Sequence, residues 1–210
     1  MRRLFDRCGL AAILLAAPLL LLAPASAATQ PANTEKVVLA GGCFWGMQAV
    51  FSELRGVKSV VAGYSGGSAD TAHYDIVSTG TTGHAESVQI EYDPAKITYG
   101  QLLSVYFLVA HDPTQLDHQG PDFGTQYRSE VFYTTDAQKR ETESYISALE
   151  AQKSFDGKIV TQVVPLRAFY PAEDYHQNYV AHNPDDPYVM YNDVPKLAAL
   201  RHQFPSLVKS

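Results

Sequence analysis

The chain has 210 residues, a formal net charge of −6, two cysteines and a hydrophobic fraction of 46%. Its acidity makes it a poor candidate for binding nucleic acid through phosphate neutralisation, or for adhering to anionic lipid. The length is sufficient for one domain with its own hydrophobic core.

Residues 1–27 have the pattern of an export signal. Three arginines precede a leucine- and alanine-rich stretch, and residues 25–27 read ASA, a small–x–small cleavage pattern. The stretch is too short and wrongly flanked for a membrane span, although an uncleaved N-terminal anchor is the alternative. We therefore expect cleavage after Ala27 and export, with the periplasm favoured over the exterior. Cys8 leaves with the signal, so Cys43 is the lone thiol of the mature chain.

A polar linker is predicted over residues 28–35, and a single domain over 36–210. The apolar run 37–40 is typical of a short buried strand that ends at two glycines. An amphipathic helix ending at Gly56 follows, and a second strand is predicted over 57–64. The apolar face of that helix has the spacing i, i+3, i+4 and i+7 and consists of Met47, Val50, Phe51 and Leu54.

Sequence patterns in the middle of the chain predict one further strand and one further helix. Alternating Val88, Ile90 and Tyr92 indicate a half-buried strand. Thr98 and Gln101 form a capping box at the start of a helix. One face of that helix carries Leu102, Leu103 and Tyr106.

The second half begins with a long polar loop over 111–129, whose length and glycine and proline content indicate a functional or mobile segment. A strand over 130–135 follows, then a helix from Thr135 to about Lys153 and a strand over 159–166. From about residue 184 we expect an irregular tail, with a short helix over 195–203.

The predicted order is strand, helix, strand, strand, helix, strand, then an extra helix and strand. This order is typical of an α/β (α+β) fold of the ferredoxin-like, split β-α-β type. In such a fold the helices cover one face of a mainly antiparallel sheet.

Cys43 lies in the segment AGGCFWGMQAVF, between a predicted strand and a predicted helix. Unpaired N–H groups at a helix start favour a thiolate, and the two preceding glycines allow a substrate to approach the backbone. Phe44 and Trp45 could hold an apolar group beside the sulfur. The competing interpretation is that Cys43 extends the apolar face of the helix, four residues before Met47.

The seven histidines show no Cys-x-x-Cys or His-x-x-x-His spacing, so the sequence predicts no metal site. His84, Glu86 and His176 could meet in space, but their positions in the sequence do not show it.

Four segments resemble the A-type peptide methionine sulfoxide reductases in content and order. They are GCFWG at 42–46, GHAE at 83–86, DFGTQYRS at 122–129 and AEDYHQNY at 172–179. The resemblance covers about 36–184, and that family's compact α/β fold agrees with the predicted order of elements. It implies reduction of methionine-S-sulfoxide, free or in proteins, as a repair of oxidised exported proteins.

The resemblance also implies roles for individual residues. Cys43 is implied as the nucleophile that becomes a sulfenic acid, and Glu86 as the acid that protonates the sulfoxide oxygen. Tyr74 and Tyr127 are implied to point their hydroxyls at the same oxygen. The implied substrate-binding residues are Phe44, Trp45, Asp122 and His176. No metal, flavin or nicotinamide is implied.

Each implied role has a simpler alternative. Glu86 could be a solvated carboxylate at a strand edge, and Tyr74 and Tyr127 could be ordinary surface rings. For Asp122 the resemblance itself implies a residue that fixes either the substrate or the nearby backbone, and for His176 a residue that acts through a neighbour.

The sequence departs from many family members because its C-terminal tail contains no cysteine. A one-cysteine enzyme stops at the sulfenic acid until an outside thiol arrives, so an external reductant is required. The candidates are a thioredoxin-like protein, a glutaredoxin-like protein and glutathione. We expect a monomer with no nucleic-acid partner and no membrane attachment after signal cleavage.

Two functions of other classes compete with this interpretation. Cys43 could act as a cysteine hydrolase or acyltransferase with His84 or His176 as base. Alternatively, Phe44 and Trp45 could form the pocket of a non-enzymatic peptide-binding protein. The first requires no reductant, and the second gives no product.

Overall fold

The structure, a computed structural model, describes residues 34–209. The export signal predicted over 1–27 therefore lies outside the described residues, as does most of the predicted linker over 28–35. Glu35 already opens the first strand, one residue before the expected start of the domain. Within the described part, no helix is both long and apolar enough to cross a membrane.

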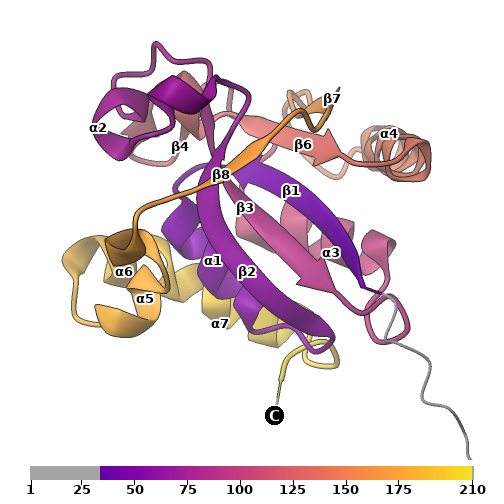
Figure 1. The fold of residues 1–210 in the computed structure, drawn as a ribbon. Coiled ribbons are helices and arrows are strands. Elements are labelled where there is room, and N and C mark those ends of the chain that lie inside the picture. The colour runs from indigo at the N-terminus through magenta and orange to yellow at the C-terminus, as the bar shows by residue number, and fades with distance from the viewer. Residues whose placement is uncertain (1–33, 210) are drawn as a thin grey trace, which may run out of the picture. The chain divides into compact units, whose positions relative to one another are not determined.

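One six-stranded sheet, in the order β7-β6-β1-β3-β2-β8, forms the centre of the described domain (Figure 1). Its strands are β1 (Glu35–Gly41), β2 (Val57–Ser65), β3 (Ala85–Tyr92), β6 (Ser129–Tyr133), β7 (Gln162–Pro165) and β8 (Phe169–Pro171). The pairs β6–β1, β1–β3, β3–β2 and β2–β8 are antiparallel, and β7 is parallel to β6. The expected mixed α/β class is confirmed, while the edge strand β8 was not predicted.

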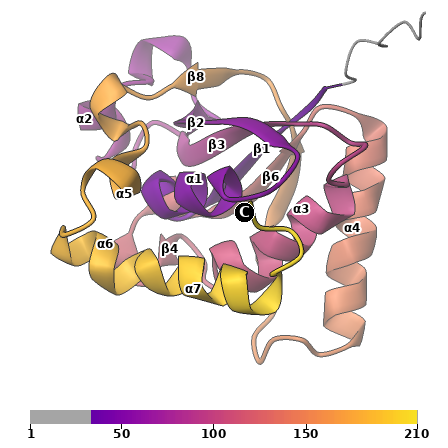
Figure 2. The ribbon, with the colours of Figure 1, turned by 90° about the horizontal axis from the view of Figure 1, so that it is seen from below.

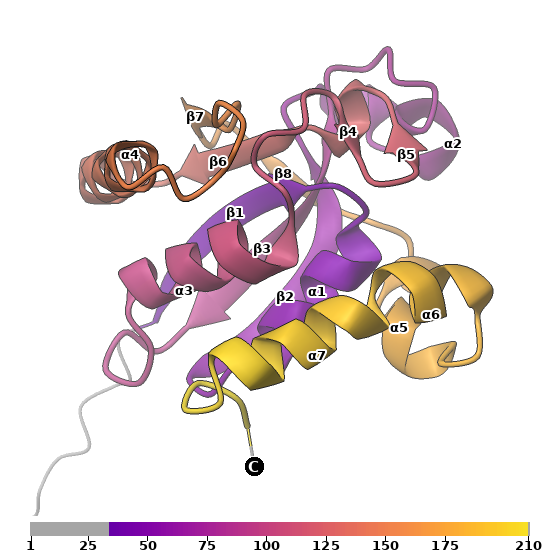
Figure 3. The ribbon, with the colours of Figure 1, turned by 180° about the vertical axis from the view of Figure 1, so that it is seen from behind.

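Three helices lie on the same face of the sheet, namely α1, α3 and α7 (Figures 2 and 3). The helices are α1 (Phe44–Ser52), α2 (Tyr74–Val77), α3 (Tyr99–Val105), α4 (Asp136–Ala151), α5 (Tyr179–His182), α6 (Pro187–Asn192) and α7 (Val194–Gln203). Helix α1 joins β1 to β2, and β3 lies between these two strands in the sheet. This is the split arrangement that the order of elements predicts.

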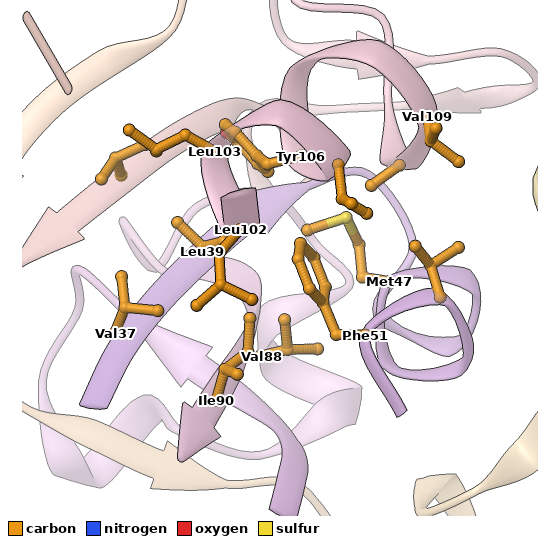
Figure 4. Close-up of a cluster of buried hydrophobic side chains, with 14 of the residues drawn as sticks. Val37, Leu39, Met47, Phe51, Val88, Ile90, Leu102, Leu103, Tyr106 and Val109 are labelled. Carbon is orange, nitrogen blue, oxygen red and sulfur yellow. The ribbon is translucent and has the colours of Figure 1, made fainter. Parts of the chain in front are cut away.

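The main core fills the space between the sheet and helices α1 and α3 (Figure 4). The alternating strand residues Val88, Ile90 and Tyr92 are all fully buried, as the period of two predicts. The predicted helix faces meet them from the other side, and the residues concerned include Met47, Phe51, Leu102 and Leu103. Burial of these faces fixes the register of α1, and therefore of Cys43, against the sheet.

Helix α3 begins with the predicted capping box, in which both the Thr98 and the Gln101 side chains bond the backbone. It continues into a π-helical turn over Tyr106–Ala110. The Tyr106 hydroxyl, on this turn, donates a 2.7 Å hydrogen bond to the carbonyl of Ala40. The turn therefore holds the end of β1 three residues before Cys43.

The expectation of an irregular tail from about 184 is wrong, because two helices, α6 and α7, follow. Asp186 caps α6 by accepting a 2.8 Å hydrogen bond from the Tyr188 N–H, and Pro187 occupies the first helical position. The helix predicted over 195–203 is present as α7, which packs against α1. Helix α1 itself ends at Ser52, before the predicted Gly56.

The long polar loop over 111–129 is ordered into small elements. It contains a two-stranded hairpin of β4 (His118–Gln119) and β5 (Asp122–Phe123), followed by a 3-10 turn over Thr125–Tyr127. The hairpin places Asp122 and the turn places Tyr127, so this loop supplies two of the residues singled out from the sequence.

Candidate active site

Cys43 is the N-cap residue of α1, as the strand–glycine–helix pattern predicts. Gly42 has a φ of +88°, which favours glycine, and a Cβ there would lie 2.6 Å from the Gln119 side chain. The turn from β1 into α1 thus depends on glycine. The thiol that follows is 8% exposed.

Glu86 is the second residue of β3 and is only 2% exposed, so it is not a solvated edge carboxylate. Its Oε2 accepts a 3.0 Å hydrogen bond from the backbone N–H of Phe44, the residue after Cys43. Burial raises the pKa of Glu86 to about 8, with a smaller increase from Asp122, and the Phe44 N–H opposes this change. The carboxyl is therefore mainly protonated at neutral pH and can donate a proton.

Tyr74 and Tyr127 are half-buried and belong to α2 and to the 3-10 turn. Burial raises the pKa of Tyr74 to about 12, with further increases from Glu86 and Cys43. The pKa of Tyr127 is also raised, first by burial and then by Glu86. Both phenols therefore remain neutral hydrogen-bond donors beside the thiol and the carboxyl.

The position of Tyr74 depends on Glu173, in the AEDYHQNY segment. Glu173 accepts hydrogen bonds from the Tyr74 backbone N–H (3.0 Å) and from the Tyr64 hydroxyl (2.8 Å). It thereby caps the start of α2 and ties it to β2.

An aromatic wall stands beside the thiol. Trp45 Nε1 donates a 3.0 Å hydrogen bond to His176 Nδ1, and the indole stacks on Tyr179 with ring centroids 3.6 Å apart. The His176 ring lies 4.9 Å from the Phe44 ring and 4.4 Å from the Tyr74 ring. His176 is thus held behind Trp45 and orients it, while Phe44 is buried in the wall.

Asp122 lies close to Tyr188, a residue of α6 that sequence reasoning missed. The Tyr188 hydroxyl donates a hydrogen bond to Asp122 Oδ2, and the pKa of Tyr188 is raised by burial and then by Cys43 and Asp122. Burial also raises the pKa of Asp122. The Asp186–Pro187 pair was the signal that could have revealed a helix carrying Tyr188 toward the site.

Asp193 and Lys196 were also missed, and they lie beneath the start of α1. The Asp193 side chain is fully buried, and Lys196 Nζ lies 3.6 Å from its Oδ1. A Cβ on Gly46 would collide with Asp193 Oδ1, so the last glycine of GCFWG makes room for this carboxylate. Burial raises the pKa of Asp193 to about 6, although Lys196 opposes the increase.

The expectation that the helix start makes Cys43 a thiolate does not hold for the resting site. Burial raises the pKa of Cys43 well above its ordinary value, and Glu86, Asp193 and Asp122 raise it further. A backbone hydrogen bond from Trp45 lowers it, as helix-start geometry predicts, but this effect is the smaller one. The resting group is a protonated thiol.

The seven other residues singled out from the sequence therefore gather around Cys43, directly or through one another. Within residues 34–209, no cluster of three or more potential metal ligands occurs. A buried thiol, a protonated carboxyl and two neutral phenols together form a thiol-based redox site able to protonate an oxygen atom.

Comparison with known proteins agrees with this class of site. Residues 35–207 match the family described as peptide methionine sulfoxide reductase. The peptide methionine sulfoxide reductase MsrA 2 of Mesorhizobium japonicum is 55% identical over 175 residues, which cover 83% of this chain and 90% of that protein.

Two solved structures from Saccharomyces cerevisiae are also similar. Reduced Mxr1 superposes with a TM-score of 0.69 at 35% identity, over 74% of this chain and 89% of that one. Mxr1 in complex with Trx2 gives a TM-score of 0.50 at 27% identity, over 71% and 87% of the two chains. The chain belongs to the A-type peptide methionine sulfoxide reductase family, and it reduces methionine sulfoxide to methionine.

Proposed function

We propose that Cys43 is the nucleophile and Glu86 the proton donor in the reduction of methionine-S-sulfoxide. The observation that carries this proposal is the hydrogen bond between Glu86 and the Phe44 N–H. This bond holds the Glu86 carboxyl, which is buried and has a raised pKa, beside Phe44, the residue after Cys43.

The first step forms a bond between Cys43 Sγ and the sulfoxide sulfur. Glu86 donates its proton to the sulfoxide oxygen, which makes the sulfur a better electrophile, and Tyr74 and Tyr127 donate hydrogen bonds to the same oxygen. As the bond forms, the proton of the Cys43 thiol passes to the Glu86 carboxylate, so the thiolate need not exist in the resting enzyme. The sulfoxide S–O bond and the new S–S bond then break as the protonated oxygen is transferred to Cys43 Sγ. The products are methionine and a Cys43 sulfenic acid.

The aromatic wall selects the substrate. Phe44 and Trp45 would hold the S-methyl group, with Trp45 oriented by His176. Because the oxygen donors and the methyl-binding wall surround the sulfur asymmetrically, only one sulfoxide epimer can present its oxygen to Glu86. The A-type family implies the S epimer.

The sulfenic acid must be reduced by a thiol from outside the described chain. Among residues 34–209, Cys43 is the one cysteine. The complex of Mxr1 with Trx2 supports a thioredoxin-like reductant, and a glutaredoxin-like protein or glutathione would serve the same chemistry. We further propose export of a monomer to the periplasm, where it repairs oxidised proteins; the arginine-flanked apolar segment 1–27 supports export.

One assay tests the function. The enzyme is incubated with dithiothreitol and a racemic methionine sulfoxide peptide, and the remaining epimers are resolved. Loss of the S epimer alone, abolished by Cys43→Ser, supports the proposal. Loss of both epimers, or of neither, contradicts it.

A second measurement tests the intermediate, with Cys8→Ser present so that Cys43 is the single thiol. After one turnover without reductant, intact mass and thiol trapping should show one added oxygen on Cys43. An unmodified Cys43 after turnover would exclude the sulfenic acid. A hydrolase would release ester or peptide products without reductant, and a binding protein would give no product.

A further inference from the structure

A cavity of about 320 Å³ reaches Cys43 from the side of the 111–122 loop and the C-terminal helices. Among the described residues that line it, Cys43, Asp122, Tyr188 and Lys196 also belong to the candidate active site. Glu86, Tyr74 and Tyr127 do not line it. The cavity therefore gives an approach to the Cys43 sulfur whose lining does not include the oxygen donors.

The second step of the reaction requires such a second approach. A thiol displaces the oxygen of a sulfenic acid by attacking the sulfur from the side opposite the departing oxygen. In the proposed mechanism that oxygen lies with Glu86 and the two phenols. These three groups do not line the cavity, so a thiol bound there would reach Cys43 without displacing them.

The lining of the cavity is about half polar and carries charges of both signs. Lys196, 24% exposed, is anchored by its ion pair with the buried Asp193. Asp112 supplies the opposite charge, because hydrogen bonds from Thr114 and Gln115 lower its pKa even though partial burial acts to raise it.

The remaining polar groups add hydrogen-bonding capacity without a further positive charge. The amides are those of Gln115, Gln119 and Asn192. His111 is neutral, because burial lowers its pKa to about 4. Asp122 faces the cavity but is already bonded by Tyr188, and burial raises its pKa. Lys196 and Asp112 thus offer charges of opposite sign to a ligand in the cavity.

We propose that this cavity binds the reductant, a small thiol that carries both an ammonium and a carboxylate group, as amino-acid and peptide thiols do. Its carboxylate pairs with Lys196, its ammonium pairs with Asp112, and its sulfur faces Cys43. The inference rests on the proposed function, since it requires a Cys43 sulfenic acid.

The chemistry balances with two molecules of this thiol. The first attacks Cys43 Sγ, an S–S bond forms, the S–O bond breaks, and the oxygen leaves as water. The second thiol attacks the mixed disulfide, which releases a small-molecule disulfide and regenerates the Cys43 thiol. The two thiols lose the two electrons that the sulfoxide gained.

The test compares monothiols of different charge in steady-state reduction of a methionine-S-sulfoxide peptide. The probes are L-cysteine, glutathione, cysteamine, 3-mercaptopropionate and 2-mercaptoethanol, each corrected for its thiolate fraction. We expect L-cysteine and glutathione to give the highest corrected kcat/KM. Dithiothreitol is the reference, because it carries no charge.

Variants then assign the charges. Lys196→Gln should lower the ratio of glutathione-driven to dithiothreitol-driven kcat/KM by about tenfold, since a charge-assisted hydrogen bond is lost. Asp112→Asn should lower the ratio of cysteamine-driven to dithiothreitol-driven kcat/KM. It should leave the corresponding ratio for 3-mercaptopropionate unchanged. The matched control is Lys139→Gln on α4, an exposed lysine with a surface ion pair, which should leave every ratio unchanged.

Ratios that are unchanged in Lys196→Gln and Asp112→Asn would overturn the inference, and so would equal corrected rates for charged and uncharged thiols. Failure of the proposed function would give a different result: the enzyme would form no methionine even with dithiothreitol as the reductant. Because each variant is judged by a ratio, a general loss of stability does not imitate the expected result.

Discussion

The backbone N–H of Phe44 donates a 3.0 Å hydrogen bond to Glu86 Oε2, across 42 positions of the sequence. One partner opens α1 and the other lies near the start of β3, so the packing of the helix on the sheet fixes the acid beside Cys43. The bond satisfies one orphan N–H of the helix start and occupies one oxygen of a carboxyl that keeps its proton. The fold thus holds the proposed nucleophile and its proposed proton donor together through a single contact.

Replacing Glu86 should separate hydrogen bonding from proton donation. We expect Glu86→Gln to lower kcat by about 10²–10⁴-fold, because the amide still accepts the Phe44 bond but cannot give up a proton to the oxygen. The wild-type rate should fall as the pH rises through about 8, where Glu86 becomes ionised. The measurement is kcat as a function of pH for both proteins. If kcat of the variant also falls above about pH 8, the titrating group is not Glu86.

The hydroxyl group of Tyr188 should contribute to catalytic efficiency. Tyr188→Phe removes the hydrogen bond to Asp122 and the polar contact with Cys43, so we expect kcat/KM to fall by about tenfold. The control is Tyr191→Phe on the same helix, whose side chain is 83% exposed and should have no effect. Equal activity of the two variants would remove Tyr188 from the site.

Gly46 should prove necessary for packing. Gly46→Ala places a Cβ against the buried carboxylate of Asp193, and we expect the free energy of unfolding to fall by about 1–3 kcal/mol. Gly100→Ala in α3 is the control, because its Cβ would meet the end of the flexible Glu141 side chain. That variant should be neutral or stabilised by up to about 1 kcal/mol. Urea denaturation measures both, and equal stability would contradict the close approach.

Trp45 is the single tryptophan of the chain, so its fluorescence reports on the aromatic wall. His176→Leu removes the acceptor of the indole N–H, and we expect a shifted emission maximum and a raised KM for the sulfoxide peptide. His176→Asn can still accept a hydrogen bond from the indole, so its emission maximum and its KM should lie closer to the wild-type values than those of His176→Leu.

The wild-type emission should also depend on pH. Burial lowers the pKa of His176 from 6.5, so protonation that blocks Nδ1 should change the emission only at lower pH. The exposed His182→Gln serves as a control with unchanged emission. A wild-type transition above pH 6.5 would contradict the buried, neutral imidazole.

The sequence by itself determined the local features. The glycine pair before Cys43, the alternation of Val88, Ile90 and Tyr92, and the capping box at Thr98 each depend on residues within a few positions of one another. Such short-range patterns fix backbone conformation and the buried face, which is why the main elements from β1 to β7 were predictable, although α2 and the β4–β5 hairpin were not predicted. The four motifs also contain seven of the eight side chains predicted at the site, and Tyr74 is the one that lies outside them.

Only the tertiary structure decided the long-range features. The edge strand β8 and the contacts of Tyr188, Asp193 and Lys196 with the site join segments far apart in the chain, which no local period encodes. The protonation of the site is also a tertiary property. The pKa of Cys43 is raised and Glu86 keeps its proton because burial removes water from both groups, and that burial exists only after the helices have packed on the sheet.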